Sequence, residues 1–197
     1  MDFIGSALKL TEEDIRAAAS LIAVEIAAIQ AVAEVESLGS GFLKSRRPVI
    51  LFESYQFHIR TKGRYDNSHP HISTKSWIRN YLGGEEEYTR LEEAIALDKR
   101  AALESASWGR FQIMGFNHLY CGFDSVEDFV QAHILNEREH LLAFCAFIKS
   151  MKLDSHLRNH DWISFARLYN GPGYARNKYD IRLANAYAKF KAKESAP

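Results

Sequence analysis

The amino-acid sequence predicts a mainly α (α+β) fold, a helical single domain with a small β element. Its 197 residues are enough to bury one substantial core. Apolar residues recur at helical spacing through most of the chain, whereas one short stretch, residues 49–59, is rich in β-branched and aromatic residues. Because no linker or internal repeat divides the chain, we expect one domain over residues 1–197, with its core at about 10–192.

The first predicted helix begins after Thr11. Thr11 and Asp14 have the spacing of a capping box, in which each side chain accepts a hydrogen bond from the other residue's backbone. From residue 21 to 35 the sequence is apolar on nearly every side. This pattern predicts a continuous buried helix.

The end of that helix carries a carboxyl that we expect to point inward. At the helical period, Glu36 is rotated by about 200° from Glu34, which lies on the polar face. Gly39 and Gly41 follow and favour the end of the helix. Glu36 is therefore expected to face the core or a cleft.

The later elements follow from the same kinds of pattern. Residues 49–59 predict one or two short strands. Helical patterns cover 85–103 and a long stretch over 125–148 that starts with a capping-box-like sequence. A further helix is expected over 162–169, capped by the aspartate before it, and a last helix over roughly 179–193.

Composition and motif spacing make several classes of function less favoured. Lys and Arg number 25, as do Asp and Glu, so no overall basic field favours binding to nucleic acid. Cys121 and Cys145 have neither zinc-site nor redox-motif spacing and are expected to be reduced. His69 and His71 have no carboxylate cluster near them, so we predict no metal and no cofactor. The N-terminus lacks the pattern of a signal peptide, which predicts synthesis in the cytoplasm.

Within the expected core of residues 10–192, a Glu-Ser pair occurs three times, as Glu36-Ser37, Glu53-Ser54 and Glu104-Ser105. Burial of Glu36 at a helix exit would raise its pKa and suit it to act as a general acid, although it could also be exposed or paired with Arg46. Glu53 could be a second acid on the side of Leu51, or a buried partner of a basic side chain. Glu104 precedes a turn of small residues.

Two turns contain residues that could contact a ligand. The first, SASWGRFQ, is a turn of small residues that would bring backbone N–H groups close to a ligand. Its two aromatic rings either stack on that ligand or belong to the core. The second, YNGPGY, places tyrosines and an amide on a tight turn, which is either a simple helix stop or a polar rim.

Several segments, in this order, resemble the N-acetylmuramidase domain family of bacteriophage endolysins. They are AVAEVESLGSGF, PVILFESYQF, EYTRLEEAIAL, AALESASWGRFQIMGFN, DWISFARLYNGPGY and NKYDIRLANAY. The resemblance runs from about residue 10 to 192. More distantly, the layout is similar to goose-type lysozymes and soluble lytic transglycosylases, which implies a lysozyme-like α+β fold without a separate wall-binding domain.

The resemblance implies a peptidoglycan hydrolase that cleaves the β-1,4 bond between N-acetylmuramic acid and N-acetylglucosamine. Glu36 would be the general acid, and Glu53 a second carboxylate or a positioning residue. The implied substrate-binding residues are Ser37, Ser107, Trp108, Gly109, Phe111, Gln112, Tyr169, Asn170 and Tyr174.

Two other functions remain open at this stage. On the same scaffold, a lytic transglycosylase would give 1,6-anhydro-muramyl products. A protein of another class would bind the cell wall or form part of a virion without catalysis. For the hydrolase, the implied partners are the peptidoglycan glycan strand and a holin or other membrane-permeabilising protein. It would act as a monomer in the periplasm or cell wall.

Overall fold

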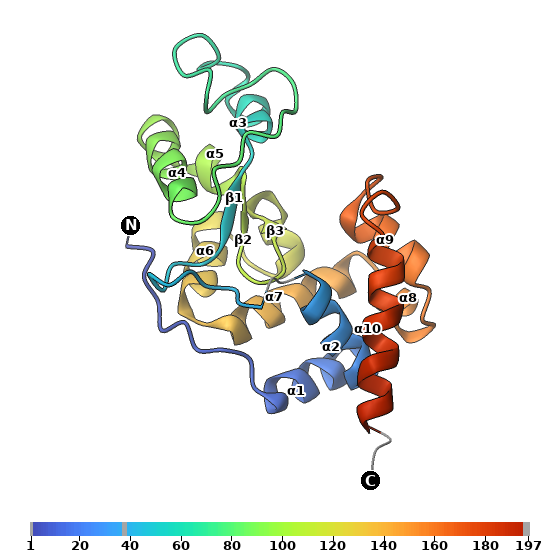
Figure 1. The fold of residues 1–197 in the computed structure, drawn as a ribbon. Helices are drawn as coiled ribbons and strands as arrows, with labels where there is room; N and C mark the ends of the chain where they lie inside the picture. The colour runs from blue at the N-terminus through green and yellow to red at the C-terminus, as the bar shows by residue number, and fades with distance from the viewer. Residues whose placement is uncertain (1, 37–38, 195–197) are drawn as a thin grey trace.

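The computed structural model describes residues 2–36 and 39–194 of the chain (Figure 1). It is mainly helical with one small sheet, as the sequence predicted. The elements in chain order are α1 (Glu12–Ile22), α2 (Ile26–Glu36), β1 (Ile50–Phe52), α3 (Ser54–Thr61), α4 (Glu86–Leu97), α5 (Lys99–Glu104), β2 (Ala106–Trp108), β3 (Ile113–Met114), the 3₁₀ helix η1 (Gly115–Cys121), α6 (Val126–Leu135), α7 (Glu137–Ser150), α8 (Asp154–Arg158), α9 (Trp162–Asn170) and α10 (Tyr179–Glu194).

The sheet has the antiparallel order β1-β2-β3. Ile50 pairs with Trp108 and Phe52 with Ala106, so the segment after α2 is joined to the segment after α5. The tight turn between β2 and β3 brings Ser107 opposite Met114. This small sheet holds the SASWGRFQ turn against the rest of the molecule.

The predicted continuous helix over residues 21–35 is wrong, because the chain breaks between α1 and α2. Ala23 adopts a left-handed conformation with φ of 53°. Its N–H and that of Val24 bond back to the carbonyls of Ser20 and Ala19, which is the pattern of a Schellman helix end. The two helices meet at an angle of 113°. The capping box of Thr11 and Asp14 at the start of α1 is confirmed.

The segment 49–59 is only partly a strand. β1 ends at Phe52, and α3 begins at Ser54. Phe57 and Thr61 lie one helical turn apart and are both buried. The apolar residues of this segment therefore form the buried face of a helix rather than one face of a sheet. The partner strand β2 is three residues long, which leaves no pairing for a longer β1.

Two predicted long helices are each divided by a polar cap. In 85–103, the Asp98 carboxylate accepts from the N–H of Ala101 and starts α5. In 125–148, the Asn136 side chain accepts from the N–H of Glu139 and starts α7. Short polar side chains can satisfy helix N-termini in this way, and the apolar periodicity continues past the break. The predicted starts of α6, α9 and α10 are confirmed.

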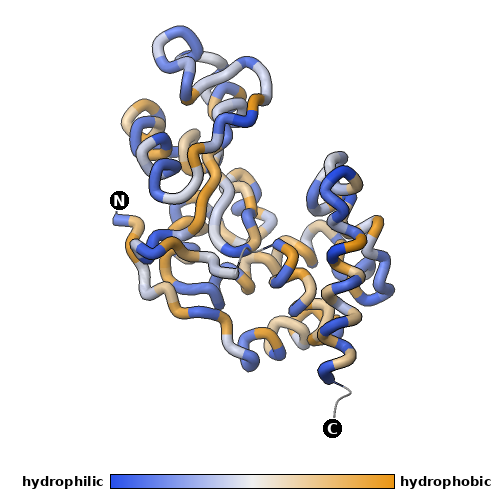
Figure 2. The backbone as a smooth tube through the Cα atoms, viewed as in Figure 1, coloured by the Kyte–Doolittle hydropathy of each residue, from blue (hydrophilic) through white to orange (hydrophobic). Residues whose placement is uncertain are grey.

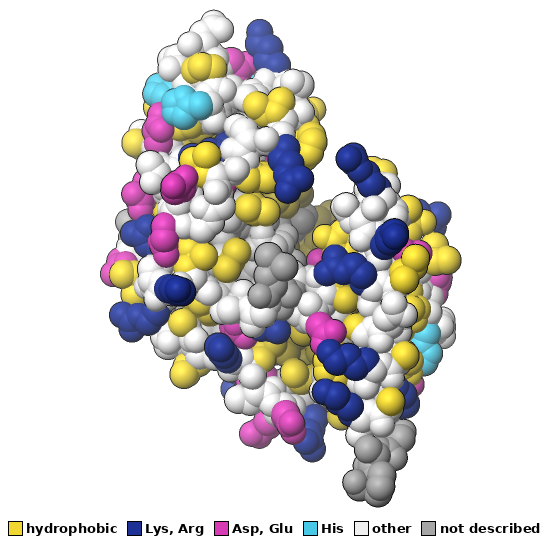
Figure 3. Space-filling view, viewed as in Figure 1, with side chains coloured by type: hydrophobic (Ala, Val, Ile, Leu, Met, Phe, Trp, Pro, Cys, Tyr) yellow, Lys and Arg dark blue, Asp and Glu magenta, His cyan; other side chains and the backbone are white. Residues whose placement is uncertain are grey.

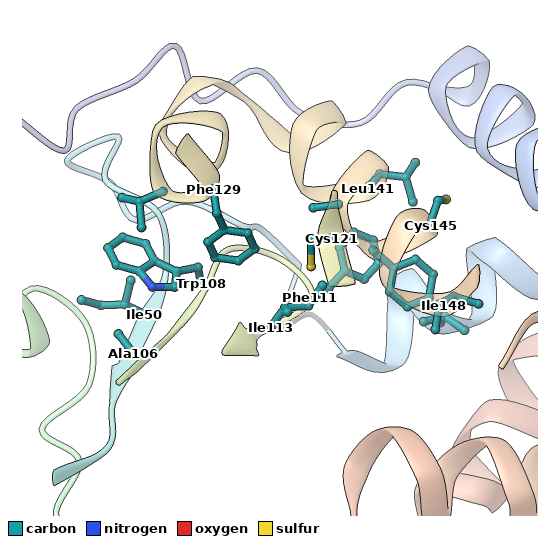
Figure 4. Packing of buried hydrophobic residues seen from close by; sticks show 14 of the residues in the cluster. Ile50, Ala106, Trp108, Phe111, Ile113, Cys121, Phe129, Leu141, Cys145 and Ile148 are labelled. Atoms are coloured by element: carbon teal, nitrogen blue, oxygen red, sulfur yellow. The ribbon is translucent and has the colours of Figure 1, made fainter. Parts of the chain in front are cut away.

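The core lies between the sheet and the helices that surround it. Trp108, Phe111 and Phe129 are buried there with both cysteines, which are free as predicted (Figure 4). β1 is hydrophobic along its length, whereas many surface turns are hydrophilic (Figure 2). α10 packs along α2, which completes a second lobe with α8 and α9 (Figure 1).

No single helix among residues 2–36 and 39–194 has the length and apolar character needed to cross a membrane. The bent pair α1 and α2 meets those criteria only when the two are taken together, by length and composition alone. The inner faces of both helices pack in the protein core.

Candidate active site

A cleft of about 460 Å³ lies between the sheet and η1 on one side and α9 and α10 on the other. Figure 3 shows the molecule hollowed between its two lobes, with Lys and Arg side chains along the lobe that contains α10. The lining residues are Glu36, Leu51, Glu53, Tyr81, Ser107, Phe111, Gln112, Ile113, Met114, Asn117, Phe147, Tyr169, Asn170 and Tyr179. Glu36 and Glu53, two of the three core glutamates that precede a serine, therefore reach one cleft.

Glu36 is the last residue of α2, and its carboxyl meets few polar partners. Asn170 Nδ2 donates to its two oxygens at 3.1 and 3.3 Å. Burial raises the pKa of Glu36 to about 7, against smaller lowering effects of the Asn170 hydrogen bond and the charge of Arg182. No ion pair to Glu36 occurs among the described residues, and Arg46 is exposed. Glu36 can therefore hold or give up a proton near neutral pH.

Glu53 lies on the same side of its segment as Leu51, as strand alternation predicted. The hydroxyl of Tyr81 donates a hydrogen bond to Glu53 Oε1. The two glutamates thus approach the cleft from different elements, one from the end of a helix and one from the end of a strand. A sugar bound between them would meet two carboxyl groups.

The SASWGRFQ turn contributes a polar frame to the cleft. Gln112, with φ of 50°, donates from Nε2 to the carbonyls of Gly109 at 2.7 Å and Val49 at 3.2 Å. Its Oε1 accepts from Ser107 Oγ at 2.9 Å. Because these bonds fix the Gln112 side chain, the turn presents a rigid wall.

Phe111 and Tyr169 line the cleft as a connected pair. The Tyr169 hydroxyl donates to the carbonyl of Phe111 at 2.9 Å. Phe111 stacks on Phe144 with ring centroids 4.6 Å apart and is 1% exposed, so its ring is fixed in the core. The YNGPGY turn is therefore tied to the SASWGRFQ turn, and Phe111 is a core residue that also lines the cleft.

Of the predicted substrate-binding residues, two lie away from the cleft and a third lies outside the residues that the structure describes. Trp108 is fully buried and donates from Nε1 to the carbonyl of Leu103, so stacking of its ring on a ligand is wrong. Strand alternation turns Ser107 to the cleft and Trp108 to the core. Tyr174 does not line the cleft. Ser37 lies outside the described residues.

Gly109 also faces away from the cleft. Its φ is +67°, and a Cβ there would lie 2.7 Å from the imidazole of His140. Glycine is required at this position because any side chain would collide with that buried ring. The predicted contact of Gly109 with substrate is therefore replaced by a structural role.

Glu104 belongs to a separate ion-pair cluster. Its carboxylate lies 2.9 Å from Arg100 Nε and 3.3 Å from Arg60 Nε. A shallow hollow between α1, α2 and α10, of about 820 Å³, is larger than the cleft but holds neither Glu36 nor Glu53. No group of three or more potential metal-binding side chains occurs within the described ranges.

Sequence reasoning missed three polar lining residues, Tyr81, Asn117 and Tyr179. Tyr81 comes from the irregular segment between α3 and α4, where no periodicity indicates direction. Tyr179 opens α10, and the Arg182 guanidinium lies 5.2 Å from its ring centre. The spacing of Tyr179 and Arg182 on one helix face was the available signal for this pair.

Among the described residues that line the cleft, Asn170 has the one buried side-chain oxygen or nitrogen atom without a hydrogen-bond partner. Its Nδ2 is used by Glu36, whereas its buried Oδ1 accepts no hydrogen bond. An unsatisfied buried acceptor costs stability unless a ligand or water supplies a donor. The position therefore suits a substrate N–H or O–H group beside the acid.

Comparisons with known proteins agree with this geometry. The family model for N-acetylmuramidase matches residues 25–191. The fold is similar to the crystal structure of Burkholderia AP3 phage endolysin, with a TM-score of 0.89 and 38% identity over 95% of this chain and 72% of that one. A search of curated proteins found no match. Because the family model covers most of the chain, including both cleft glutamates, this protein belongs to the N-acetylmuramidase family and is a glycosidase.

Proposed function

We propose that the protein is an endolysin that cleaves the β-1,4 bond between N-acetylmuramic acid and N-acetylglucosamine during lysis of a bacterial host. The observation that carries this proposal is the Glu36 carboxyl, which lines the cleft with a pKa of about 7. A glycosidic oxygen is a weak base, so its departure requires a proton donor that remains protonated near neutral pH. The family and the similar phage endolysin support the same substrate class.

In the proposed reaction, Glu36 gives its proton to the bridging oxygen as the bond from that oxygen to the muramyl anomeric carbon breaks. The N-acetylglucosamine unit leaves as an alcohol, and positive charge develops on the muramyl ring. A water molecule then supplies the hydroxyl group to that carbon, and its released proton restores Glu36 directly or through Glu53. The site thus returns to its starting protonation state.

Glu53 is proposed as the second carboxylate. From the other side of the cleft, it can stabilise the developing positive charge, attack the anomeric carbon or activate water. Its hydrogen bond from Tyr81 orients one oxygen and leaves the other for this work. The presence of a second carboxylate in the cleft supports hydrolysis over internal attack by the muramyl 6-hydroxyl.

The polar side chains that line the cleft are proposed to bind the sugars on either side of the glycosidic bond that is cleaved. Asn170 Oδ1 would accept from an acetamido N–H or a hydroxyl group, which would satisfy its buried lone pairs. The hydroxyls of Ser107 and Tyr179 offer further hydrogen bonds from opposite walls. Substrate binding would therefore complete the hydrogen bonding that the protein alone leaves open.

The test is the variant Glu36→Gln, assayed by clearing of permeabilised Gram-negative cells. We expect activity to fall by about 100-fold or more, because general acid catalysis contributes on this scale, while binding to purified peptidoglycan is kept. Mass spectrometry of wild-type products should show hydrolysed, reducing muramyl ends. Unchanged clearing by the variant would refute Glu36 as the acid, and 1,6-anhydro ends would identify a transglycosylase instead.

Access to the wall is proposed to depend on a membrane-permeabilising partner such as a holin. We expect expression of the protein alone in bacteria to leave cells intact, and co-expression with a membrane-perforating protein to cause lysis. Turbidity of the two cultures measures this. Prompt lysis without the partner would contradict the dependence.

A further inference from the structure

The segment between α3 and α4 exposes three large apolar side chains. Trp77 is 59% exposed, Leu82 58% and Ile78 43%. Of the three tryptophans in the chain, Trp108 is fully buried and Trp162 packs against the core. An exposed tryptophan beside two exposed aliphatic residues is a feature of binding surfaces rather than of ordinary surface loops.

Side-chain and backbone hydrogen bonds hold this segment in place at both ends. Near its start, Thr74 Oγ1 lies 3.0 Å from Ser54 Oγ, which also donates to Asn80 Oδ1. Near its end, the backbone N–H groups of Leu82 and Gly83 donate to Glu87 Oε1 at 2.6 and 3.0 Å. The apolar side chains are therefore presented by a fixed loop.

The same buried carboxylate connects the loop to the strand that leads into the cleft. Glu87 Oε2 accepts from the N–H of Phe52 at 3.0 Å and from Arg90 at 3.1 Å. Phe52 is the last residue of β1 and directly precedes Glu53. One carboxylate thus sets the position of the loop relative to a cleft glutamate.

Side chains continue this connection into the cleft itself. Burial and Glu53 raise the pKa of Tyr81 overall, whereas the Trp77 side chain lies close enough to the Tyr81 hydroxyl to lower that pKa. Tyr81 lines the cleft and donates in turn to Glu53. The exposed indole is therefore one residue removed from the cleft wall, at the rim on the side of Glu53.

We propose that Trp77, with Ile78 beside it, forms an additional sugar-binding subsite at the rim of the cleft. This inference rests on the proposed function and names a residue that extends its substrate site. A glycan strand is longer than the two sugars at the broken bond, so sugars further along it must cross the rim. The C–H face of a sugar or its acetamido methyl group packs on the indole, and the loop that presents the indole is already held by hydrogen bonds at both ends.

Binding is tested in the Glu36→Gln background, where the substrate is not consumed. The probes are stem-peptide-free glycan fragments from peptidoglycan, from the disaccharide to longer oligosaccharides, titrated by calorimetry. Adding Trp77→Ala should weaken binding of long fragments roughly three- to tenfold, as expected for loss of one ring contact. Binding of the disaccharide should not change, because it does not reach the rim.

Two further variants show whether the ring itself is responsible. Trp77→Phe keeps an aromatic face and should restore most of the affinity. Leu21→Ala removes a similarly exposed apolar side chain from α1, in the other lobe, and should leave affinity unchanged. The indole emission should shift to shorter wavelength when a long fragment binds, and this shift should be absent in Trp77→Phe.

The outcomes separate this inference from the proposed function. Equal affinity of Trp77→Ala and its parent for long fragments would overturn the subsite. So would an equal loss for the disaccharide, because that indicates a general disturbance of the cleft. Neither result bears on whether Glu36→Gln abolishes clearing, which alone tests the acid.

Discussion

Glu137 and Glu36 both lie at helix ends, but their different surroundings give the same type of side chain two different roles. Glu137, the first residue of α7, is fully buried and accepts from the N–H groups of Gly41 at 2.7 Å and Leu10 at 3.1 Å, and from Arg110 at 2.9 Å. Glu36, the last residue of α2, accepts only from Asn170 within the described chain. The Glu137 carboxyl thus has several hydrogen-bond donors around it, whereas the Glu36 carboxyl has one in the part of the chain that the structure describes.

The helix ends strengthen this contrast. Glu36 lies at the C-terminal end of α2, where the partial negative charge of the helix disfavours an ionised carboxyl, whereas Glu137 lies at the N-terminal end of α7. The two sites are also connected, because Arg110 donates to the carbonyls of Ala33 in α2 and Gly39 beyond it. The anchored carboxylate therefore supports the helix end that carries the reactive one.

The same substitution at these two positions should have opposite effects on stability. We expect Glu137→Gln to lower the free energy of unfolding by about 3–5 kcal/mol, because Arg110 loses its charge partner and an amide N–H group would face backbone donors. Urea denaturation at pH 7 measures this. A loss below about 1 kcal/mol would show that Glu137 is not the anchor described.

Glu36→Gln should instead stabilise the protein, and more at pH 8 than at pH 5. The folded pKa of about 7 exceeds the ordinary value of 4.5, so ionisation favours the unfolded chain. The resulting loss of stability is absent below about pH 4.5, grows as the pH rises towards 7 and is complete above it. The variant avoids this cost, which we expect to be about 1–3 kcal/mol. Denaturation curves at the two pH values measure it, and a pH-independent difference would contradict it.

Near Glu137, the buried His140 should make the stability of the protein fall as the pH is lowered, which is opposite to the effect of Glu36. His140 Nδ1 accepts from the backbone N–H of Arg110, and its Nε2 donates to the carbonyl of His133. Burial lowers the pKa of His140 to about 4. Because the unfolded imidazole binds a proton below about pH 6.5, stability should fall between pH 6.5 and 4.

Denaturation at pH 7, 5.5 and 4 measures that loss, and NMR of the imidazole resonances assigns it. The resonance of the exposed His71 serves as the reference. A His140 signal that titrates near pH 6.5 would exclude the buried histidine as the cause.

Asn170→Ala should have the smallest effect of these substitutions, a shift in the pH dependence of activity that tests how Asn170 sets the pKa of Glu36. The Asn170 hydrogen bond lowers the pKa of Glu36, so its loss should raise that pKa further. Since the acid must be protonated, the alkaline limb of kcat/KM should move to higher pH. Asn117→Ala, which also alters the cleft lining, is the control and should leave the limb in place. A shift to lower pH would contradict the assigned role.

The sequence by itself determined features that depend on neighbours along the chain. The capping residue Thr11, the buried helix before Glu36 and the placement of Glu53 beside Leu51 all follow from short-range periodicity and hydrogen bonding. These signals were sufficient for the mainly helical fold class and for two glutamates of the cleft.

Only the tertiary structure decided which segments meet. The break at Ala23 and the helical form of residues 54–61 depend on what each face packs against, and the burial of Trp108 depends on a sheet that joins distant strands. Tyr81 reaches Glu53 because Glu87 holds its loop, a contact between residues far apart in sequence. Periodicity describes one element at a time, whereas the donors around a carboxylate, and hence its chemistry, come from elements that the fold brings together.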